Sequence, residues 1–161
     1  DFGDMTVGRY ALASLADATR GCTSGGHTGS LSNIIDYVTV QTLGNSADFG
    51  DLYVAIHKHT AYADATRGCI AVGGANGGRR NVIQYITIQT LGNSADFGDL
   101  TQQKETTGGC ASTTRGLQGG GSLTGTGATN TIDYVTIATL GNAVDFGDLT
   151  SAREGNGACA A

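Results

Sequence analysis

Residues 130–149 read NTIDYVTIATLGNAVDFGDL, and two earlier stretches follow the same pattern, NIIDYVTVQTLGNSADFGDL at 33–52 and NVIQYITIQTLGNSADFGDL at 81–100. Each copy begins with a run of β-branched and aromatic residues, passes through Gly-Asn, and ends on Asp-Phe-Gly-Asp. A run of this composition bounded by Asn and Gly predicts a β-strand followed by a tight turn. The recurrence predicts a repeat architecture in which this stretch is the packed framework.

The Asp-Phe-Gly-Asp motif marks the repeats. Its four copies start at Asp1, Asp48, Asp96 and Asp145. A single repeat domain, 1–161, therefore divides into repeats 1–47, 48–95 and 96–144 and a partial repeat 145–161. A Thr-Arg-Gly triplet follows the motif at a constant distance in each full repeat, with its arginine at Arg20, Arg67 and Arg115. Constant spacing of this kind indicates elements that pack against one another.

Length and content vary only between the Thr-Arg-Gly triplet and the next framework asparagine, over residues 22–32, 69–80 and 117–129. Variation confined to one Gly-rich segment predicts a surface loop that presents a recognition surface. Polar side chains in these segments are the candidate ligand-binding residues: Ser24, His27, Thr28, Asn76, Arg79, Arg80, Ser122, Thr124 and Thr126.

The pattern predicts an all-β fold with four short strands per repeat. In the first repeat these are Thr6–Leu12, Arg20–Gly25, the Ile-Asp-Tyr run and Ala47–Leu52. Helical periodicity is absent, and the 27 glycines disfavour helices.

Composition excludes several classes of protein. The net charge of −5 and the lack of a basic stripe exclude a general nucleic-acid binder. No stretch approaches the length of a membrane span, and no signal segment is evident. The chain does not begin with Met, which is typical of a processed product or a fragment.

Four cysteines, Cys22, Cys69, Cys110 and Cys159, allow three disulfide pairings in an oxidising, extracellular setting. Cys22 and Cys69 follow the Thr-Arg-Gly triplet directly, whereas Cys110 and Cys159 occupy an earlier position of the repeat. The hypothesis is that Cys69 bridges to Cys110 in the next repeat, and that Cys22 and Cys159 either close a ring or link successive subunits. Four unpaired small side chains in strands are the alternative.

The Asp-Phe-Gly-Asp motif is interpreted as structural. A kinase would also need a phosphate loop and a catalytic loop, and neither is present. The aspartates are expected to accept backbone N–H groups and to pair with the Thr-Arg-Gly arginines. The residues of this structural motif are Asp48, Asp51, Arg67, Asp96, Asp99 and Arg115. A calcium ion bound by Asn45, Asp48 and Asp51 is the competing hypothesis.

No catalytic arrangement is evident, so no enzyme activity, no cofactor and no metal are predicted. His57 and His59 have the spacing of two residues on one face of a strand and could share a transition metal. The other repeats carry no such pair, which favours a packed or solvated face.

The repeat resembles a kelch-type blade, with four strands, a Gly-Gly pair and a following tyrosine. More closely, it is similar to the kelch-like repeat proteins of marine bacteriophages. Their signature is matched here by Thr114-Arg115-Gly116, Gly119-Gly120, the run 130–137 and the run 141–149. The resemblance implies β-propeller blades in a virion structural or tail-fibre protein, located outside cells or on the virion surface.

Three full repeats are fewer than a closed propeller needs, so the exposed ends imply self-association into an oligomer or fibre. The expected function is structural and adhesive, with other virion proteins or surface glycans as further partners. The alternatives are a secreted glycan-binding propeller and a self-assembling extracellular filament subunit.

Overall fold

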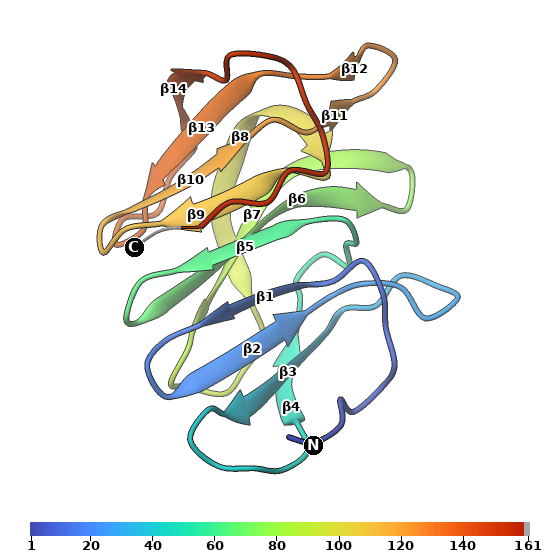
Figure 1. The fold of residues 1–161 in the computed structure, drawn as a ribbon, viewed down its shortest axis with the longest axis vertical. Helices are drawn as coiled ribbons and strands as arrows, with labels where there is room; N and C mark the ends of the chain where they lie inside the picture. Colours follow the sequence, from blue (N-terminus) through green and yellow to red (C-terminus); the bar gives the residue numbers. More distant parts are fainter. Residues whose placement is uncertain (160–161) are drawn as a thin grey trace.

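The computed structural model describes residues 1–159 and is all-β, with fourteen strands and no helix in that range. The all-β prediction is confirmed. Three antiparallel sheets follow one another in chain order along the long axis of the molecule, with the N-terminal sheet at one end (Figure 1). None of the described residues forms a helix that is long and apolar enough to cross a membrane.

Each sheet is an antiparallel meander that uses one copy of the framework sequence. The first sheet contains β1 (Ala13–Ala16), β2 (Arg20–Ser24), β3 (Ile34–Thr39) and β4 (Ala47–Asp51). The second contains β5 (Thr60–Ala63), β6 (Arg67–Ala75), β7 (Gly78–Thr87) and β8 (Ala95–Glu105). The third contains β9 (Gly108–Ala111), β10 (Arg115–Gly119), β13 (Thr131–Thr136) and β14 (Val144–Asp148).

A hairpin from the third repeat extends the second sheet. Its strands are β11 (Ser122–Leu123) and β12 (Gly127–Ala128), and β11 pairs with the end of β8. The second sheet thus has six strands. The variable segments are therefore not plain loops, because in the second repeat this segment continues β6 and β7 and in the third it forms the β11–β12 hairpin.

The second, third and fourth predicted strands are confirmed to within a residue or so as β2, β3 and β4, but the first is wrong. Residues 6–12 form no regular strand, and β1 begins only at Ala13. The backbone interrupts the predicted strand at Ala11, which has a positive φ of 56° and leaves the β region.

The positive-φ position recurs in every repeat and links the repeats in series. Lys58 and Thr106 hold the same place as Ala11, with φ values of 54° and 57°. The Lys58 N–H donates to the Ala11 carbonyl at 2.8 Å, and the Thr106 N–H donates to the Lys58 carbonyl at 2.8 Å. The Gly155 N–H continues the series to the Thr106 carbonyl at 2.9 Å. A backbone conformation that prevents strand formation thereby ties each repeat to the next.

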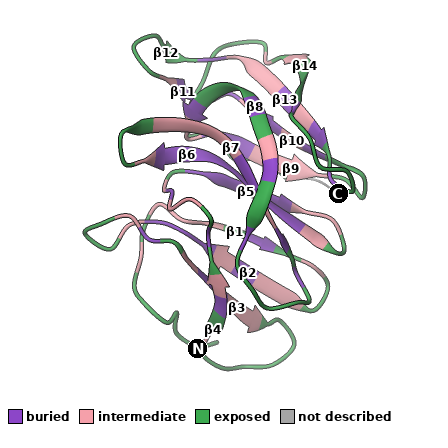
Figure 2. Cartoon of the chain, turned by 180° about the vertical axis from the view of Figure 1, so that it is seen from behind, coloured by how far each residue is buried: buried purple, intermediate pink, exposed green. Residues whose placement is uncertain are grey.

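The hydrophobic core lies between the sheets rather than within one of them. One cluster joins the first sheet to the second and includes Leu15, Phe49 and Ile86. The other joins the second sheet to the third and includes Tyr62 and Ile137. β6 lies between the outer sheets and is buried along most of its length (Figure 2). Each sheet therefore depends on its neighbour for its apolar contacts.

Candidate functional site

The Asp-Phe-Gly-Asp copies in β4 and β8, the last strands of the first two meanders, dock on the Gly-Asn turn of the next copy of the framework sequence, which belongs to the following sheet. The Gly92 N–H donates to the Phe49 carbonyl at 2.9 Å, and the Ser94 N–H donates to the Asp51 carbonyl at 2.8 Å. The Asp51 N–H in turn donates to the Asn93 side-chain oxygen at 2.9 Å. We call this set of three hydrogen bonds the inter-repeat joint.

The inter-repeat joint occurs three times along the chain. Gly44, Asn45 and Ser46 make it with residues 2–4, and Gly141, Asn142 and Ala143 make it with residues 97–99. Glycine is required within the motif because a Cβ on Gly50 would lie 2.5 Å from the Gly92 carbonyl oxygen. The Asn45 side-chain oxygen, which the calcium hypothesis takes as a ligand, thus already accepts the Asp4 N–H.

Two of the three Thr-Arg-Gly arginines, Arg20 and Arg67, bind the neighbouring sheet, whereas Arg115 is exposed and stacks on Tyr134 of its own sheet at 4.8 Å. The Arg20 Nη1 donates to the Ile88 carbonyl at 2.7 Å, and its guanidinium lies 4.5 Å from the centre of the Tyr37 ring. Arg67 Nη1 donates in the same way to the Ile137 carbonyl at 2.6 Å. A guanidinium that stacks on an aromatic ring and donates to a carbonyl needs no carboxylate partner.

The expected Arg–Asp bridges of the repeat motif are therefore wrong. The ion pairs found among residues 1–159 are Arg9–Asp36, Lys58–Glu105, Arg79–Glu105 and Lys104–Asp133. None of them involves a Thr-Arg-Gly arginine or an aspartate of the Asp-Phe-Gly-Asp motif. The aspartates Asp48, Asp51, Asp96 and Asp99 contribute through their backbone and their place in β4 and β8.

Two of these ion pairs are fully buried, each joining the segment after an Asp-Phe-Gly-Asp copy to the central strand of a sheet. Arg9 Nη2 lies 2.7 Å from Asp36 Oδ2, and Lys104 Nζ lies 2.8 Å from Asp133 Oδ2, with all four side chains 0% exposed. Arg9 Nη2 also donates a hydrogen bond to Asp36 Oδ2, and Lys104 Nζ donates to the Thr131 carbonyl oxygen at 3.4 Å. Burial lowers the pKa of Arg9, and the Asp36 charge opposes that effect.

The second repeat replaces the ion pair by a neutral version at the same place. Ile56 stands where Arg9 and Lys104 stand, and Gln84 stands where Asp36 and Asp133 stand. The Gln84 amide donates to the Val54 carbonyl at 2.9 Å and accepts the Val54 N–H at 2.8 Å. The sequence analysis did not find these ion pairs. An alignment of the repeats indicates them, because the acidic and the basic residue are replaced together in the second repeat.

The variable segments emerge together at one end of the sheets, on the right side of Figure 1. Arg79 in the second segment donates to Thr124 Oγ1 at 3.1 Å and to Ser122 Oγ at 3.0 Å in the third. It also pairs with Glu105 Oε1 at 3.2 Å, and Lys58 Nζ lies 3.9 Å from the same oxygen. These contacts fix the second and third segments to each other.

The first segment joins the same surface through aromatic contacts. The Tyr10 hydroxyl lies 3.0 Å from His27 Nδ1, and the His27 ring centre lies 5.9 Å from that of His57. The His57 Nδ1 in turn lies 3.0 Å from the Gly74 carbonyl oxygen in the second segment. We call the continuous surface made by the three variable segments the loop edge.

The predicted ligand-binding residues divide into two groups on the loop edge. Seven of them are exposed or half-buried: His27, Thr28, Asn76, Arg79, Arg80, Thr124 and Thr126. Ser24 and Ser122 are buried, and Ser24 Oγ lies 3.1 Å from His59 Nε2. These two serines therefore support the segments from beneath and do not meet a ligand at the surface.

His57 and His59 do not form a metal site. His59 is buried against Ser24, and desolvation together with the His57 charge lowers its pKa to about 3. Its Nδ1 has no hydrogen-bond partner within the described residues, so the Ser24–His59 pair lacks the acid of a catalytic triad. No group of three or more His, Cys, Asp or Glu residues in the described part of the chain could hold a metal ion.

The disulfides predicted within the chain are not formed, since all four cysteines, which lie in the described range, are free thiols. A Cys22–Cys159 link between subunits stays a prediction. Cys69 belongs to the core between the second and third sheets, whereas Cys110 lines a cavity of about 280 Å³ beside the C-terminal segment. Cys22 and Cys159 lie at opposite ends of the array. Burial raises the pKa of the Cys22 and Cys69 thiols to about 11 and about 12, so both stay protonated.

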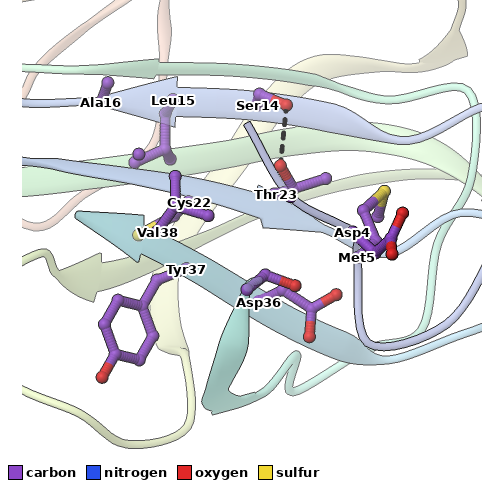
Figure 3. Close-up of a pocket in the computed structure, with 13 residues that line it drawn as sticks. Asp4, Met5, Ser14, Leu15, Ala16, Cys22, Thr23, Asp36, Tyr37 and Val38 are labelled. Atoms are coloured by element: carbon purple, nitrogen blue, oxygen red, sulfur yellow. Dashed lines mark hydrogen bonds between the residues drawn. The ribbon is translucent and has the colours of Figure 1, made fainter. Parts of the chain in front are cut away.

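A cavity of about 370 Å³ lies on the free face of the first sheet (Figure 3). Ser14, Ala16, Thr23 and Val38 line it from β1, β2 and β3, and Met5 closes one side. Its lining is mostly apolar, and the Ser14 hydroxyl bonds that of Thr23 at 3.1 Å. The corresponding faces of the second and third sheets are covered by the preceding sheet.

No protein-family model matches the chain, and no curated protein matches it at a significant level. The function proposed below therefore rests on the loop edge and on the joints between repeats.

Proposed function

We propose that the chain is a structural and adhesive repeat protein of an extracellular particle or filament, of the phage virion or tail-fibre type. Its sheets act as kelch-like blades, and the loop edge binds glycans on another surface. The observation that carries the proposal is that all three variable segments meet on one edge of an otherwise constant framework. Sequence variation is thereby concentrated where a ligand can reach it.

The position of the first strands supports the blade arrangement. β1, β5 and β9 lie next to one another, so the three sheets radiate from a common line of first strands. The inter-repeat joints connect the last strands, β4 and β8, to the Gly-Asn turns of the following sheets. Successive antiparallel meanders that share a line of inner strands are typical of propeller blades.

The polarity of the loop edge supports binding of a hydrophilic ligand. Arg79 and Arg80 are the charged residues within the three variable segments, and Lys58 and the Glu105 carboxylate lie beside Arg79, so the segments themselves carry positive charge on an acidic chain. Asn76 and Thr126 are exposed, and within the described residues their side chains make no hydrogen bond. Their donors and acceptors are therefore free for hydroxyl or carboxylate groups of a ligand.

The test is binding of the purified chain to an array of neutral and acidic glycans. We expect the double variant Asn76→Ala/Thr126→Ala to lose at least about tenfold in affinity, because two ligand-facing hydrogen-bonding groups are removed. Thr113→Ala is the matched control, since Thr113 is exposed in the turn between β9 and β10 at the other end of the sheets. Wild-type protein that binds no glycan, or binding that the double variant does not weaken, would contradict the proposal.

A further inference from the structure

His27 and His57 face each other on the loop edge, at the junction of the first two repeats. Their ring centres are 5.9 Å apart, and the ring planes meet at 60°. His27 belongs to the first variable segment, whereas His57 precedes β5 in the second repeat. Both residues are half-buried, so each presents part of its surface to solvent. Neither ring takes part in the ion pairs or the inter-repeat joints.

The hydrogen bonds of the two rings determine which nitrogen carries the proton. The Gly29 N–H donates to His27 Nδ1 at 3.1 Å, so this nitrogen is bare and the neutral ring has its proton on Nε2. The Tyr10 hydroxyl lies 3.0 Å from the same nitrogen and can donate to it. The His57 Nδ1 lies 3.0 Å from the Gly74 carbonyl oxygen, which can only accept, so His57 has its proton on Nδ1 and a bare Nε2. Neither Nε2 atom makes a hydrogen bond within residues 1–159, so the pair presents a free donor on His27 and a free acceptor on His57.

Glu105 adds a second acceptor beside His57. Tyr10, His57 and Glu105 occupy the same position of the three repeats, directly before the positive-φ residues, whose hydrogen-bond series places them side by side. A Cβ on Gly74 would lie 2.6 Å from His57 Cε1 and 2.9 Å from Glu105 Oε2, so both side chains close over this glycine. Arg79 Nη2 donates to Glu105 Oε1, whereas Oε2 makes no hydrogen bond among residues 1–159. Glu105 Oε2 is therefore free for a ligand.

We propose that His27, His57 and Glu105 form a subsite of the loop edge that binds neighbouring hydroxyl groups of a neutral sugar. One hydroxyl oxygen accepts the His27 Nε2–H, the next hydroxyl donates to His57 Nε2, and Glu105 Oε2 accepts a further hydroxyl hydrogen. We call these three residues the histidine subsite. The inference rests on the glycan binding proposed above, and it names the ligand class and the residues that select it.

The arrangement of donor and acceptors favours hydroxyl groups over a metal ion or an anion. A metal ion binds a bare ring nitrogen, but the bare nitrogen of His27 already accepts the Gly29 N–H, and a proton occupies the other nitrogen. A carboxylate or sulfate group has only acceptors, so it would leave His57 Nε2 without a donor and would be repelled by the Glu105 carboxylate. A hydroxyl group both donates and accepts, so two neighbouring hydroxyls satisfy His27 and His57 together.

The experiment is nuclear magnetic resonance of the imidazole nitrogens in the isotope-labelled full chain, at a mildly alkaline pH that keeps the rings neutral. In the free protein we expect His27 to have its proton on Nε2 and His57 on Nδ1. The neutral probes are methyl mannoside, methyl glucoside and methyl galactoside at millimolar concentrations. We expect at least one of them to shift the Nε2 signals of both residues in a saturable way. His59 is the internal control, because it is buried beside Ser24 and its signals should not move.

Two substitutions each remove one ligand contact and keep the protein contact of the same side chain. His27→Asn retains an oxygen that can accept the Gly29 N–H and removes the Nε2–H donor. His57→Asn retains an amide N–H for the Gly74 carbonyl and removes the Nε2 acceptor. We expect each variant to bind the responsive sugar about threefold to tenfold more weakly, because one hydrogen bond is lost. Thr113→Ala should bind it as the wild type does, and circular dichroism checks that each variant is folded.

The outcomes separate the histidine subsite from the adhesive function. No saturable shift at His27 and His57 with any of the three sugars would overturn the subsite, and so would a response to methyl glucuronide alone or one that EDTA abolishes. Array binding that Asn76→Ala/Thr126→Ala weakens and the two asparagine variants leave unchanged would overturn the subsite and keep the adhesive function. Sugar shifts at both histidines without binding to any array glycan would support the subsite and contradict the adhesive function.

Discussion

Replacing Lys104 by methionine is expected to lower the free energy of unfolding by about 3–5 kcal/mol. The substitution leaves the Asp133 carboxylate fully buried without its cation. Thr101 still donates to Asp133 Oδ1 at 2.5 Å, but one neutral hydroxyl does not replace an ammonium group. Urea unfolding followed by circular dichroism measures the loss. A single variant as stable as the wild type would show that the ion pair contributes nothing.

The second repeat supplies the control for this prediction. The double variant Lys104→Ile/Asp133→Gln copies Ile56 and Gln84 and removes both charges together. Because the main cost of the single variant is the unpaired charge, we expect the double variant to recover about half of the loss or more. The recovery of stability stays incomplete, because Ser94 Oγ also donates to Gln84 Oε1 at 3.0 Å in the second repeat. The third repeat has Ala143 at the position of Ser94 and cannot make this hydrogen bond. A double variant less stable than Lys104→Met would contradict this explanation.

Gly116→Ala is expected to destabilise the chain by about 3 kcal/mol, through overpacking between the second and third sheets. A methyl group at this position would overlap the Tyr62 ring. That ring is 4% exposed and belongs to the core cluster, so it has no free space into which it can move. Thermal unfolding followed by circular dichroism measures the effect.

Gly21→Ala is the matched substitution for Gly116→Ala. Gly21 holds the same position of the repeat on the free face of the first sheet, where a new Cβ would lie 3.5 Å from the nearest Val38 carbon. We expect a change of less than about 0.5 kcal/mol, because the site is open and the φ angle is not positive. If the two variants lost the same free energy of unfolding, the destabilisation would reflect strand propensity and not the packing of Tyr62.

The strands that follow the framework sequence could be predicted, because their composition and turn residues determine them locally. Arg20–Ser24 and Ala47–Asp51 fall where the pattern placed them. The first strand could not be predicted in this way. Its position depends on the positive φ at Ala11, which belongs to a hydrogen-bond series across three repeat boundaries. No local signal marks an alanine for that conformation.

The partners of charged residues were the least predictable part of the site. Constant spacing between Arg67 and the aspartates indicated a common framework, but Arg67 reaches the Ile137 carbonyl 70 residues away. The buried ion pairs escaped notice because Arg9 lies in a segment without a regular pattern. The loop edge was foreseen from sequence variation, but the burial of Ser24 was not, since it depends on His59 from the following repeat.

Amide hydrogen exchange at the second aspartate of each Asp-Phe-Gly-Asp copy tests the central claim that this motif is a joint between repeats. Asp51 and Asp99 donate their N–H groups to the side chains of Asn93 and Asn142, whereas no asparagine among residues 1–159 accepts the N–H of Asp148 in the third sheet. At micromolar concentration we expect Asp51 and Asp99 to exchange on the order of 100-fold more slowly than Asp148, without added calcium. Exchange at Asp51 and Asp99 as fast as at Asp148, or protection that appears only with calcium, would contradict the account.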